Sequence, residues 1–371
     1  DELPLFPLSV SVPDGVRADL LPNDPSQPVF VYRTAERDKL IGISPHDVQT
    51  LAGLVDVLIL EGDGARRLHF KMPRENEPVI PPLTTLVIPI ASYQVLGKSL
   101  DSFSVFNAAG IVEAFDYLPG ERIRSSMIAR VMRDPRGGVK NAPQEARVIP
   151  FLNGVPREGY GRARARFIAQ QILQNPRIDR VVIGDSRDPD PVYEVVKRTG
   201  AIVLAAGLST RMGTPKVLLE WMNGDTILDH ILCELRSAYV SEICVVTGNQ
   251  ADAVTAIAQK HGAHAVLNPD YAAGEMLSSL QAGLRGLSES ESAALIVLGD
   301  QPSLRAGMVK RVMRAYWAQN TRIVAPSYQN RRGHPILIDR AYWGELFALP
   351  PEAAPRDVIN RHSSEITYVI A

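Results

Sequence analysis

Apolar and polar positions alternate regularly along the C-terminal half of the chain, and the pattern predicts strands that alternate with helices. Short apolar runs predict strands at 201–204, 243–246, 265–267, 294–298, 322–325 and 336–338. Apolar residues that recur every three or four positions predict helices at 226–239, 251–261, 276–287, 306–318 and 356–362. Asp225 is the expected N-cap of the first of these helices. This alternation favours a Rossmann-like α/β fold with a mostly parallel sheet.

The N-terminal half shows a second, less regular series of the same kind. Apolar runs predict strands at 29–32, 55–60, 85–90, 147–152 and 180–183, with a helix at 160–174. A second α/β domain with a mostly parallel sheet is therefore expected here. The polar, proline-containing stretch 184–191 predicts a boundary, followed by a short helix at 192–198. We thus expect two domains, at 1–187 and 198–371.

Composition narrows the class of protein. The chain has 371 residues, 45% of them hydrophobic and 22% charged, and a formal net charge of −1, which argues against nucleic acid as a partner. The two cysteines, Cys233 and Cys244, have a spacing that fits no metal-binding pair. No apolar run approaches the length of a membrane span, and no basic leader opens the chain. We expect a cytoplasmic protein without a membrane partner.

The segment LAAGLSTRMGTPK, residues 204–216, follows the first strand of the C-terminal block directly. Ligands of open α/β sheets bind beyond the carboxyl ends of strands, and small residues there let backbone amides approach a phosphate. Arg211 and Lys216 add positive charge for a triphosphate. A glycine turn with two solvated cations is the alternative interpretation, which the combination of strand, glycines and both cations disfavours.

Three further segments follow or precede predicted strands. Asp300, in LGDQP, ends an apolar strand and suits Mg²⁺, although an aspartate here also fits a helix N-cap. NPDYAAGEMLSSL, residues 268–280, opens a helix where Ser278 and Ser279 suit a base or ribose, or simply cap the helix. RRGHP, residues 331–335, is a basic turn that suits an anionic second substrate, although exposed arginine pairs are usually only solvated.

In this order, LAAGLSTRMGTPK, NPDYAAGEMLSSLQAGL, GDQP and RRGHP resemble the MobA/MocA-like nucleotidyltransferases, over residues 201–371. That family attaches a nucleoside monophosphate to the molybdenum cofactor. LAAG with GDQP and GHP resembles its cytidylyltransferase branch, whereas the guanylyltransferase branch usually has glycine where Ala206 stands. The resemblance implies that CMP passes from CTP to molybdopterin and that pyrophosphate leaves, with Mg²⁺ as cofactor.

The resemblance and the chemistry of the side chains together assign expected roles. Arg211, Lys216 and Asp300 are the expected catalytic residues, and Asp300 is the expected Mg²⁺ ligand. Arg331, Arg332 and His334 are expected to bind the pterin phosphate. The remaining nucleotide-binding positions, with Lys216, are Leu204, Ala205, Ala206, Gly207, Ser209, Gly213, Asp270 and Ser278.

The N-terminal block carries five segments that resemble the YqeC-type accessory proteins of selenium-dependent molybdenum hydroxylases, over residues 18–184. They are EGDGA (61–65), FKMP (70–73), NEPVIP (76–81), GGVKNAP (137–143) and VIPFLN (148–153). The resemblance implies a P-loop-NTPase-like fold and a molybdenum hydroxylase apoenzyme as a partner. Glu61 and Asp63 would be metal-side carboxylates of such a fold, or acidic turn residues.

Two departures weaken the prediction of an NTPase. The family opens with a glycine-rich phosphate loop containing Lys-Thr or Lys-Ser, and no such loop precedes Glu61 in this sequence. Where the family has its base-binding motif, this sequence has Asn153-Gly154-Val155-Pro156 instead. Either the loop lies upstream of Asp1, or the block is a binding or docking module, which we favour.

Two other functions remain open for the whole chain. One is a nucleotidyltransferase that activates a sugar phosphate or an alcohol phosphate, which the RRGHP turn and the YqeC-like block disfavour. The other is a non-catalytic chaperone that carries the cofactor, which Lys216 and Asp300 disfavour.

Overall fold

The computed structural model describes residues 8–17, 19, 28–36, 39–207, 215–222, 224–273, 276–318, 321–328 and 331–370. By its contacts the chain divides into two compact units. Unit 1 comprises residues 1–64, 75–85 and 141–146, and unit 2 comprises residues 65–74, 86–140 and 147–371. The domain limits of 1–187 and 198–371 stay a prediction. Among the described residues, no helix combines the length and the apolar character that crossing a bilayer requires.

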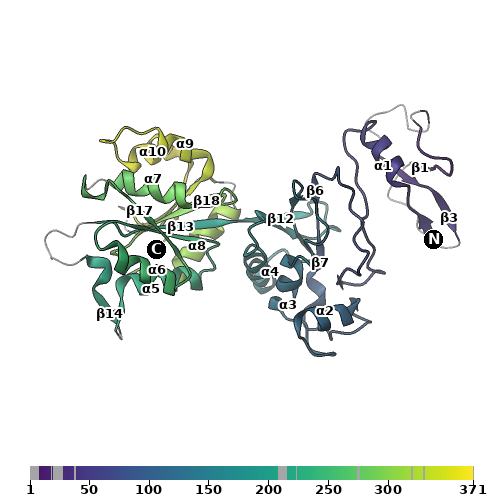
Figure 1. Cartoon of the computed structure of the whole chain (residues 1–371), viewed down its shortest axis with the longest axis horizontal. Coiled ribbons are helices and arrows are strands. Elements are labelled where there is room, and N and C mark those ends of the chain that lie inside the picture. Colours follow the sequence, from purple (N-terminus) through teal and green to yellow (C-terminus); the bar gives the residue numbers. More distant parts are fainter. Residues whose placement is uncertain are drawn as a thin grey trace. The chain divides into compact units, whose positions relative to one another are not determined.

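Unit 1 contains short elements (Figure 1). Strand β1 (Leu8–Ser11) pairs in parallel with β2 (Val29–Tyr32), and β3 (Thr34–Glu36) pairs antiparallel with β4 (Lys39–Ile41). Helix α1 (Pro45–Ala52) begins at a capping box, in which the hydroxyl of Ser44 accepts from the backbone N–H of Asp47.

The predicted strand at 55–60 is wrong. The structure assigns no strand to this segment. Val57 is 75% exposed and Ile59 is 88% exposed, so the apolar run is not buried as a sheet strand would be. Hydrophobicity alone predicted a strand here, but a strand also needs a hydrogen-bonding neighbour.

Unit 2 contains a smaller sheet with the order β12-β11-β10-β7. Strands β7 (Ile90–Ser92), β10 (Phe151–Asn153) and β11 (Arg180–Gly184) are parallel, and β12 (Val192–Lys197) is antiparallel to β11. Two short parallel pairs accompany this sheet: β5 (Phe70–Lys71) with β8 (Val105–Phe106), and β6 (Leu86–Val87) with β9 (Arg147–Val148). The helices of this part are α2 (Ala108–Phe115), α3 (Ser125–Arg133) and α4 (Gly159–Ile172).

The predicted helix at 192–198 is wrong, because β12 occupies this segment. Along β12 the buried residues are Glu194 and Val196, which are two positions apart, as the two faces of a strand require. The polar stretch before it is the turn of a β11–β12 hairpin, in which the N–H of Asp185 donates to the carbonyl of Pro191 at 3.1 Å. Only Arg198 then separates β12 from the first strand of the next sheet.

The larger sheet of unit 2 has the order β17-β16-β13-β18-β21-β19-β20, and β22 pairs with β19. Four neighbouring strands are parallel: β13 (Thr199–Leu204), β16 (Ile243–Thr247), β17 (His264–Leu267) and β18 (Ala293–Leu298). The others are β19 (Ile323–Tyr328), β20 (Arg331–Arg332), β21 (Ile336–Asp339) and β22 (Ile366–Ile370). Because β21 is antiparallel to β18, the sheet is mixed beyond β18.

Helices cover both faces of this sheet (Figure 1). They are α5 (Ile227–Ser237), α6 (Ala251–Lys260), α7 (Met276–Gly286), α8 (Ala306–Ala318), α9 (Trp343–Phe347) and α10 (Pro355–Arg361). A hairpin of β14 (Glu220–Met222) and β15 (Asp225–Thr226) precedes α5. Thr226, not Asp225 as predicted, is the N-cap of α5, because its hydroxyl accepts from the N–H of Asp229 at 3.1 Å.

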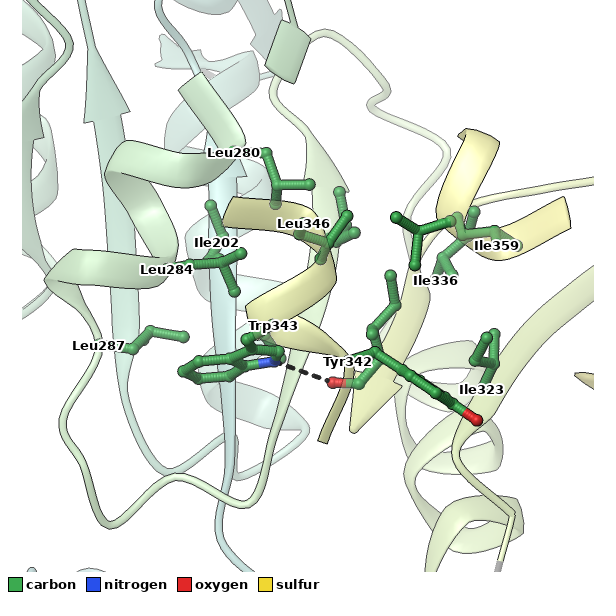
Figure 2. Packing of buried hydrophobic residues seen from close by; sticks show 14 of the residues in the cluster. Ile202, Leu280, Leu284, Leu287, Ile323, Ile336, Tyr342, Trp343, Leu346 and Ile359 are labelled. Carbon is green, nitrogen blue, oxygen red and sulfur yellow. Dashed lines mark hydrogen bonds between the residues drawn. The ribbon is translucent and has the colours of Figure 1, made fainter. Parts of the chain in front are cut away.

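One face of the sheet packs a dense apolar core under α7, α9 and α10 (Figure 2). Leu280 and Leu284 lie one turn apart on α7 and pack with Ile202 of β13. Trp343 closes the core, and its indole N–H donates to the carbonyl of Ile338 at 3.4 Å. A Cβ on Gly283 would lie 2.3 Å from Ile202 Cγ2, so glycine allows α7 to lie close against the sheet. This packing holds β13, the strand that leads into the predicted site, against α7.

Candidate nucleotide-binding edge

The carboxyl ends of four parallel strands meet at one edge of the larger sheet. Leu204, the last residue of β13, lies opposite both Val246 of β16 and Leu298 of β18. In the strand order, β13 lies between β16 and β18, and both of these strands follow β13 in the sequence. Such a topological switch point is where α/β sheets bind ligands. Because β21 runs antiparallel to β18, with Ile336 opposite Ile296, the turn before β21 comes to the same edge.

The segment after β13 continues along this edge. The N–H of Ala205 donates to the carbonyl of Val246 at 3.0 Å, and Ala205 and Ala206 are buried. Gly207 is exposed, and a Cβ at this position would meet no atom within 4 Å. Of the predicted site residues, Ser209, Arg211 and Gly213 lie outside the described residues.

Lys216 and Asp300 face each other across the edge, although 84 positions separate them in the sequence. Lys216 begins a short 3₁₀ helix, and Asp300 follows β18 by two residues. The ammonium Nζ lies 3.1 Å from the carboxylate Oδ2. The two side chains are 50% and 41% exposed, so both charges remain accessible to a ligand from solvent.

Two glycines allow the strand ends to approach each other closely. A Cβ on Gly299 would lie 2.6 Å from the carbonyl oxygen of Leu204, and its N–H donates to that same oxygen at 3.1 Å. A Cβ on Gly248 would lie 2.7 Å from the carbonyl oxygen of Ala206 and 2.6 Å from Tyr271 Cβ. Sequence reasoning missed Gly248, and a glycine directly after the strand 243–247 was the available signal.

Asn268 fastens the turn after β17 to the start of α7. It is 1% exposed, and its amide nitrogen donates to the hydroxyls of Ser278 and Ser279, each at 3.0 Å. Its Oδ1 accepts from the N–H of Asp270 at 3.0 Å, and the Asp270 side chain is exposed at the edge. Asn268 thus contacts both the backbone of Asp270 and the side chain of Ser278. Asn268 itself was not predicted, because an Asn-Pro pair after a strand indicates only a turn.

The basic segment RRGHP precedes β21 at the same edge, but its two arginines form strand β20 rather than the predicted turn. Arg331 is exposed, and Arg332 donates from Nη1 to Asn360 Oδ1 at 3.2 Å. Arg332 Nε is buried and has no hydrogen-bond partner among the described residues. Burial lowers the pKa of His334, which favours the neutral imidazole.

The donor set at Asp300 is sparse. Among the described residues, no group of three or more histidine, cysteine, aspartate or glutamate side chains is placed to hold a metal ion. Mg²⁺ is commonly bound by one or two carboxylates, while substrate phosphates and water supply the other oxygens. Asp300, 41% exposed beside the tip of β13, fits that way of binding.

Comparison with known proteins identifies both parts of the chain. The family model of the MobA-like NTP transferase domain matches residues 201–366, and that of the YqeC protein matches residues 17–109. The uncharacterized protein YqeC of Escherichia coli K12 is 26% identical over 156 residues, which are 42% of this chain and 60% of that protein. The chain therefore spans less than two thirds of that relative.

Two relatives match the C-terminal part at the same level. The molybdenum cofactor cytidylyltransferase of E. coli K12 is 32% identical over 143 residues, 38% of this chain and 69% of that protein. The nicotine blue oxidoreductase of Paenarthrobacter nicotinovorans is 32% identical over 146 residues, 37% of this chain and 69% of that protein. Through residues 201–366 the chain belongs to the MobA-like NTP transferase family, with a nucleotidyltransferase domain, and its N-terminal part carries a YqeC domain.

Proposed function

We propose that the chain transfers CMP from CTP to the terminal phosphate of molybdopterin and releases pyrophosphate, with Mg²⁺ as cofactor. The observation that carries the proposal is the pairing of β13 with β18, which sets Lys216 within 3.1 Å of Asp300 beside the exposed Gly207. A cation, a carboxylate and a stretch of accessible backbone are the groups that a triphosphate with a divalent ion requires.

The protein's contribution to the reaction is positioning and neutralisation of charge. An oxygen of the pterin phosphate forms a bond to the α-phosphorus of CTP, and the bond from that phosphorus to the β-phosphate oxygen breaks in line. Pyrophosphate takes the electron pair of the broken bond. Lys216, with Arg211 as a further proposed cation, holds the departing phosphates, since negative charge grows there as the bond breaks.

Mg²⁺, when bound, neutralises phosphate charge and so makes the α-phosphorus more open to attack. Asp300 would be its protein ligand, and Lys216 would then exchange its contact with Asp300 for a phosphate oxygen. The two arginines of β20 (Arg331–Arg332) would bind the acceptor phosphate, and the buried Nε of Arg332 supports a role that demands a fixed guanidinium.

We also propose that the product passes to a molybdenum hydroxylase apoenzyme. The support is the YqeC domain carried on the same chain, matched over residues 17–109. CTP is proposed over GTP because the C-terminal part is similar to a cytidylyltransferase and has Ala206 in the LAAG motif.

Pyrophosphate release tests the proposal, because nucleotidyl transfer releases pyrophosphate whereas an oxidoreductase reaction does not. This matters because one of the two relatives of the C-terminal part is named an oxidoreductase. The full chain is incubated with Mg²⁺, each nucleoside triphosphate in turn, and molybdopterin. CTP-dependent release that needs the pterin is expected. Release that needs a sugar phosphate instead, or no release with any triphosphate, would contradict the proposal.

The variant Asp300→Asn tests the proposed metal role of Asp300 in the same assay. Loss of the proposed metal ligand is expected to lower kcat by at least about 100-fold, on the scale of removing one transition-state charge contact. Glu289→Gln serves as the control, because Glu289 is exposed and precedes β18, at the opposite end of that strand. Asp300→Asn that keeps a tenth of wild-type turnover would rule out the metal role of Asp300.

A further inference from the structure

Arg305 is an arginine that the fold holds in place without a carboxylate. It is exposed and directly precedes α8, in the turn that follows Asp300. Its Nη1 donates to the carbonyls of Pro302 at 3.0 Å and Leu304 at 2.9 Å, and to Nε2 of His230 at 2.8 Å. All three acceptors are neutral, because an imidazole nitrogen that accepts carries no proton. Among the described residues, Arg305 forms no ion pair.

Other exposed arginines of this chain are held by aspartates. Arg136, Arg157 and Arg187 each have a guanidinium nitrogen at 3.0 Å or less from an aspartate oxygen. In those arginines the contact that fixes the side chain also neutralises its charge. At Arg305 the guanidinium is fixed, but its charge has no such partner in the part of the chain that the structure describes.

The side of the Arg305 guanidinium that has no contact is the side that suits an anion. The planar guanidinium has five N–H donors, and its Nε and Nη2 form one fork of two parallel donors. Neither nitrogen of this fork makes a hydrogen bond with a described residue. Glu234, one turn beyond His230 on α5, accepts instead from the N–H of Ala306 at 2.6 Å. The fork therefore remains for two oxygens of one phosphate.

An aromatic ring lies next to the same histidine. The centre of the Trp221 ring is 6.1 Å from that of the His230 ring, and 39° separates the two planes. Trp221 belongs to β14, whose pairing with β15 shifts register at this residue, as at a β-bulge, which re-aims a side chain. This hairpin packs beside α5 (Figure 1). The indole is 39% exposed, so Arg305 and Trp221 offer an accessible cation and an accessible ring next to one imidazole.

We propose that Arg305 and Trp221 together bind a small molecule in which a phosphate group is attached to a heteroaromatic ring. The fork of Arg305 holds the phosphate, and the ring of the ligand stacks on the indole of Trp221. The bound phosphate supplies the negative charge that the neutral acceptors of Arg305 do not. The site uses neither Lys216 nor Asp300, so the proposal does not rest on the nucleotidyl-transfer function.

Arginine labelling of the full chain with phenylglyoxal, mapped by mass spectrometry, tests the proposal at Arg305 itself. Rates are measured at constant ionic strength and without a divalent ion, so that nucleotidyl transfer plays no part. CMP is expected to slow the modification of Arg305 about tenfold, inorganic phosphate to slow it less, and cytidine to leave it unchanged. Arg314, exposed on α8, is the reference and should react at an unchanged rate. Equal protection of both arginines, or no protection of Arg305 by CMP, would overturn the proposal.

Orotate, a pyrimidine that carries a carboxylate, distinguishes the two anions that fit an arginine fork. Protection of Arg305 by CMP but not by orotate supports a phosphate as the group bound. Protection by orotate as strong as that by CMP would show that any anion on a ring is accepted, and the proposed class of ligand would be wrong.

Two matched variants test the part played by the ring. Trp221→Ala is expected to raise the CMP concentration for half-protection of Arg305 about tenfold, because stacking is lost, and to leave that for inorganic phosphate unchanged. Met222→Ala shortens another exposed side chain of β14 and should change neither concentration. If CMP reached Arg305 from the β13–β18 edge instead, Trp221→Ala would leave its protection unchanged, and the proposal would be wrong. Equal effects of the two variants would also contradict it.

Discussion

The two cysteines have different surroundings, and this difference is open to a simple chemical test. Cys244 lies within β16 and is completely buried, which raises the pKa of its thiol to about 12. Cys233 is exposed on α5, with its Sγ 3.7 Å from His261 Nδ1, and partial burial followed by the charges of Asp225 and Asp229 raises its pKa as well. The thiolate is the reactive form.

A thiol reagent at pH 8 is therefore expected to modify Cys233 slowly and to spare Cys244 until the protein is denatured. Counting modified thiols over time gives the answer, and Cys233→Ser should abolish the reaction of the native protein. Modification of both thiols at similar rates in the native state would contradict the burial of β16.

His334 makes the stability of the C-terminal part depend on pH. Burial lowers its pKa in the folded state, whereas the unfolded chain keeps a value near 6.5. On acidification the unfolded chain takes up this proton first, so stability is fully present above about pH 6.5 and falls as the pH drops toward the folded-state pKa. Urea unfolding should thus occur at a lower midpoint at pH 5.5 than at pH 7.5.

The variant His334→Gln is expected to show a smaller difference between the urea midpoints at pH 5.5 and pH 7.5. The three tryptophans, Trp221, Trp317 and Trp343, all belong to the C-terminal part, so their fluorescence follows its unfolding. None of the three tryptophans lies in the smaller-sheet part, which contains His69. The pKa of His69 is also lowered, by burial and then by the charge of Lys98. His46→Gln, at an exposed position in α1, is the control. An unchanged pH dependence in His334→Gln would show that other groups cause it.

At the scale of elements, the close approach of β13 and β18 depends on Gly299. A methyl group there would lie 2.6 Å from the carbonyl oxygen of Leu204 and 3.0 Å from Val217 Cγ1. Gly299→Ala is expected to lower the free energy of unfolding by about 1–3 kcal/mol, the usual effect of overpacking. Denaturant unfolding measures this change. Gly307→Ala, on α8 with no atom within 4 Å of the new methyl group, should leave stability equal or higher, and equal effects of both would contradict the packing described for the strand ends.

The pattern of the sequence predicts elements best where burial is continuous. The parallel strands β13, β16 and β18 are buried along nearly their whole length, so their apolar runs were easily recognised. The segment Val192–Lys197 was taken for a helix, because its alternation is short and interrupted by charge. Strand β22 was not predicted at all, because its pairing with β19 joins positions far apart in the chain.

The residues of the candidate site likewise divide into those that a single sequence can predict and those that it cannot. Positions directly after strands, such as Gly207 and Asp300, can be predicted from the chain alone, since parallel strands end at a common edge. Asn268 and Gly248 act through contacts with other segments, and a single sequence contains no sign of those contacts. The distance between Lys216 and Asp300 likewise required the register of β13 against β18.

At the scale of the molecule, a buried ion pair joins the smaller-sheet part to the larger sheet within unit 2. Arg198 Nη2 lies 2.6 Å from Glu291 Oε1, and the two side chains are 5% and 0% exposed. Arg198 Nη1 also donates to the carbonyl of Leu173, just after α4, at 2.6 Å. Burial raises the pKa of Glu291, since its carboxylate is poorly solvated.

Arg198→Met is expected to destabilise the fold by about 3–5 kcal/mol, because it leaves Glu291 buried without its cation. Chemical denaturation measures the loss, and adding Glu291→Gln to the same chain should restore part of it. Arg187→Ala removes an arginine whose side chain is 71% exposed beside Asp185, and it should leave the unfolding midpoint unchanged. A similar midpoint for both arginine variants would contradict the importance of the buried pair.

The continuity of β12 and β13 has a practical consequence for any attempt to divide the protein. Residue 198 alone connects the last strand of one sheet to the first strand of the other, so no flexible linker is available there to cut. A fragment that begins at Thr199 would retain Glu291 yet lack the guanidinium that neutralises it. Such a truncation would therefore weaken the half that holds the candidate nucleotide-binding edge, and low activity of that fragment would be no evidence about the role of the half removed.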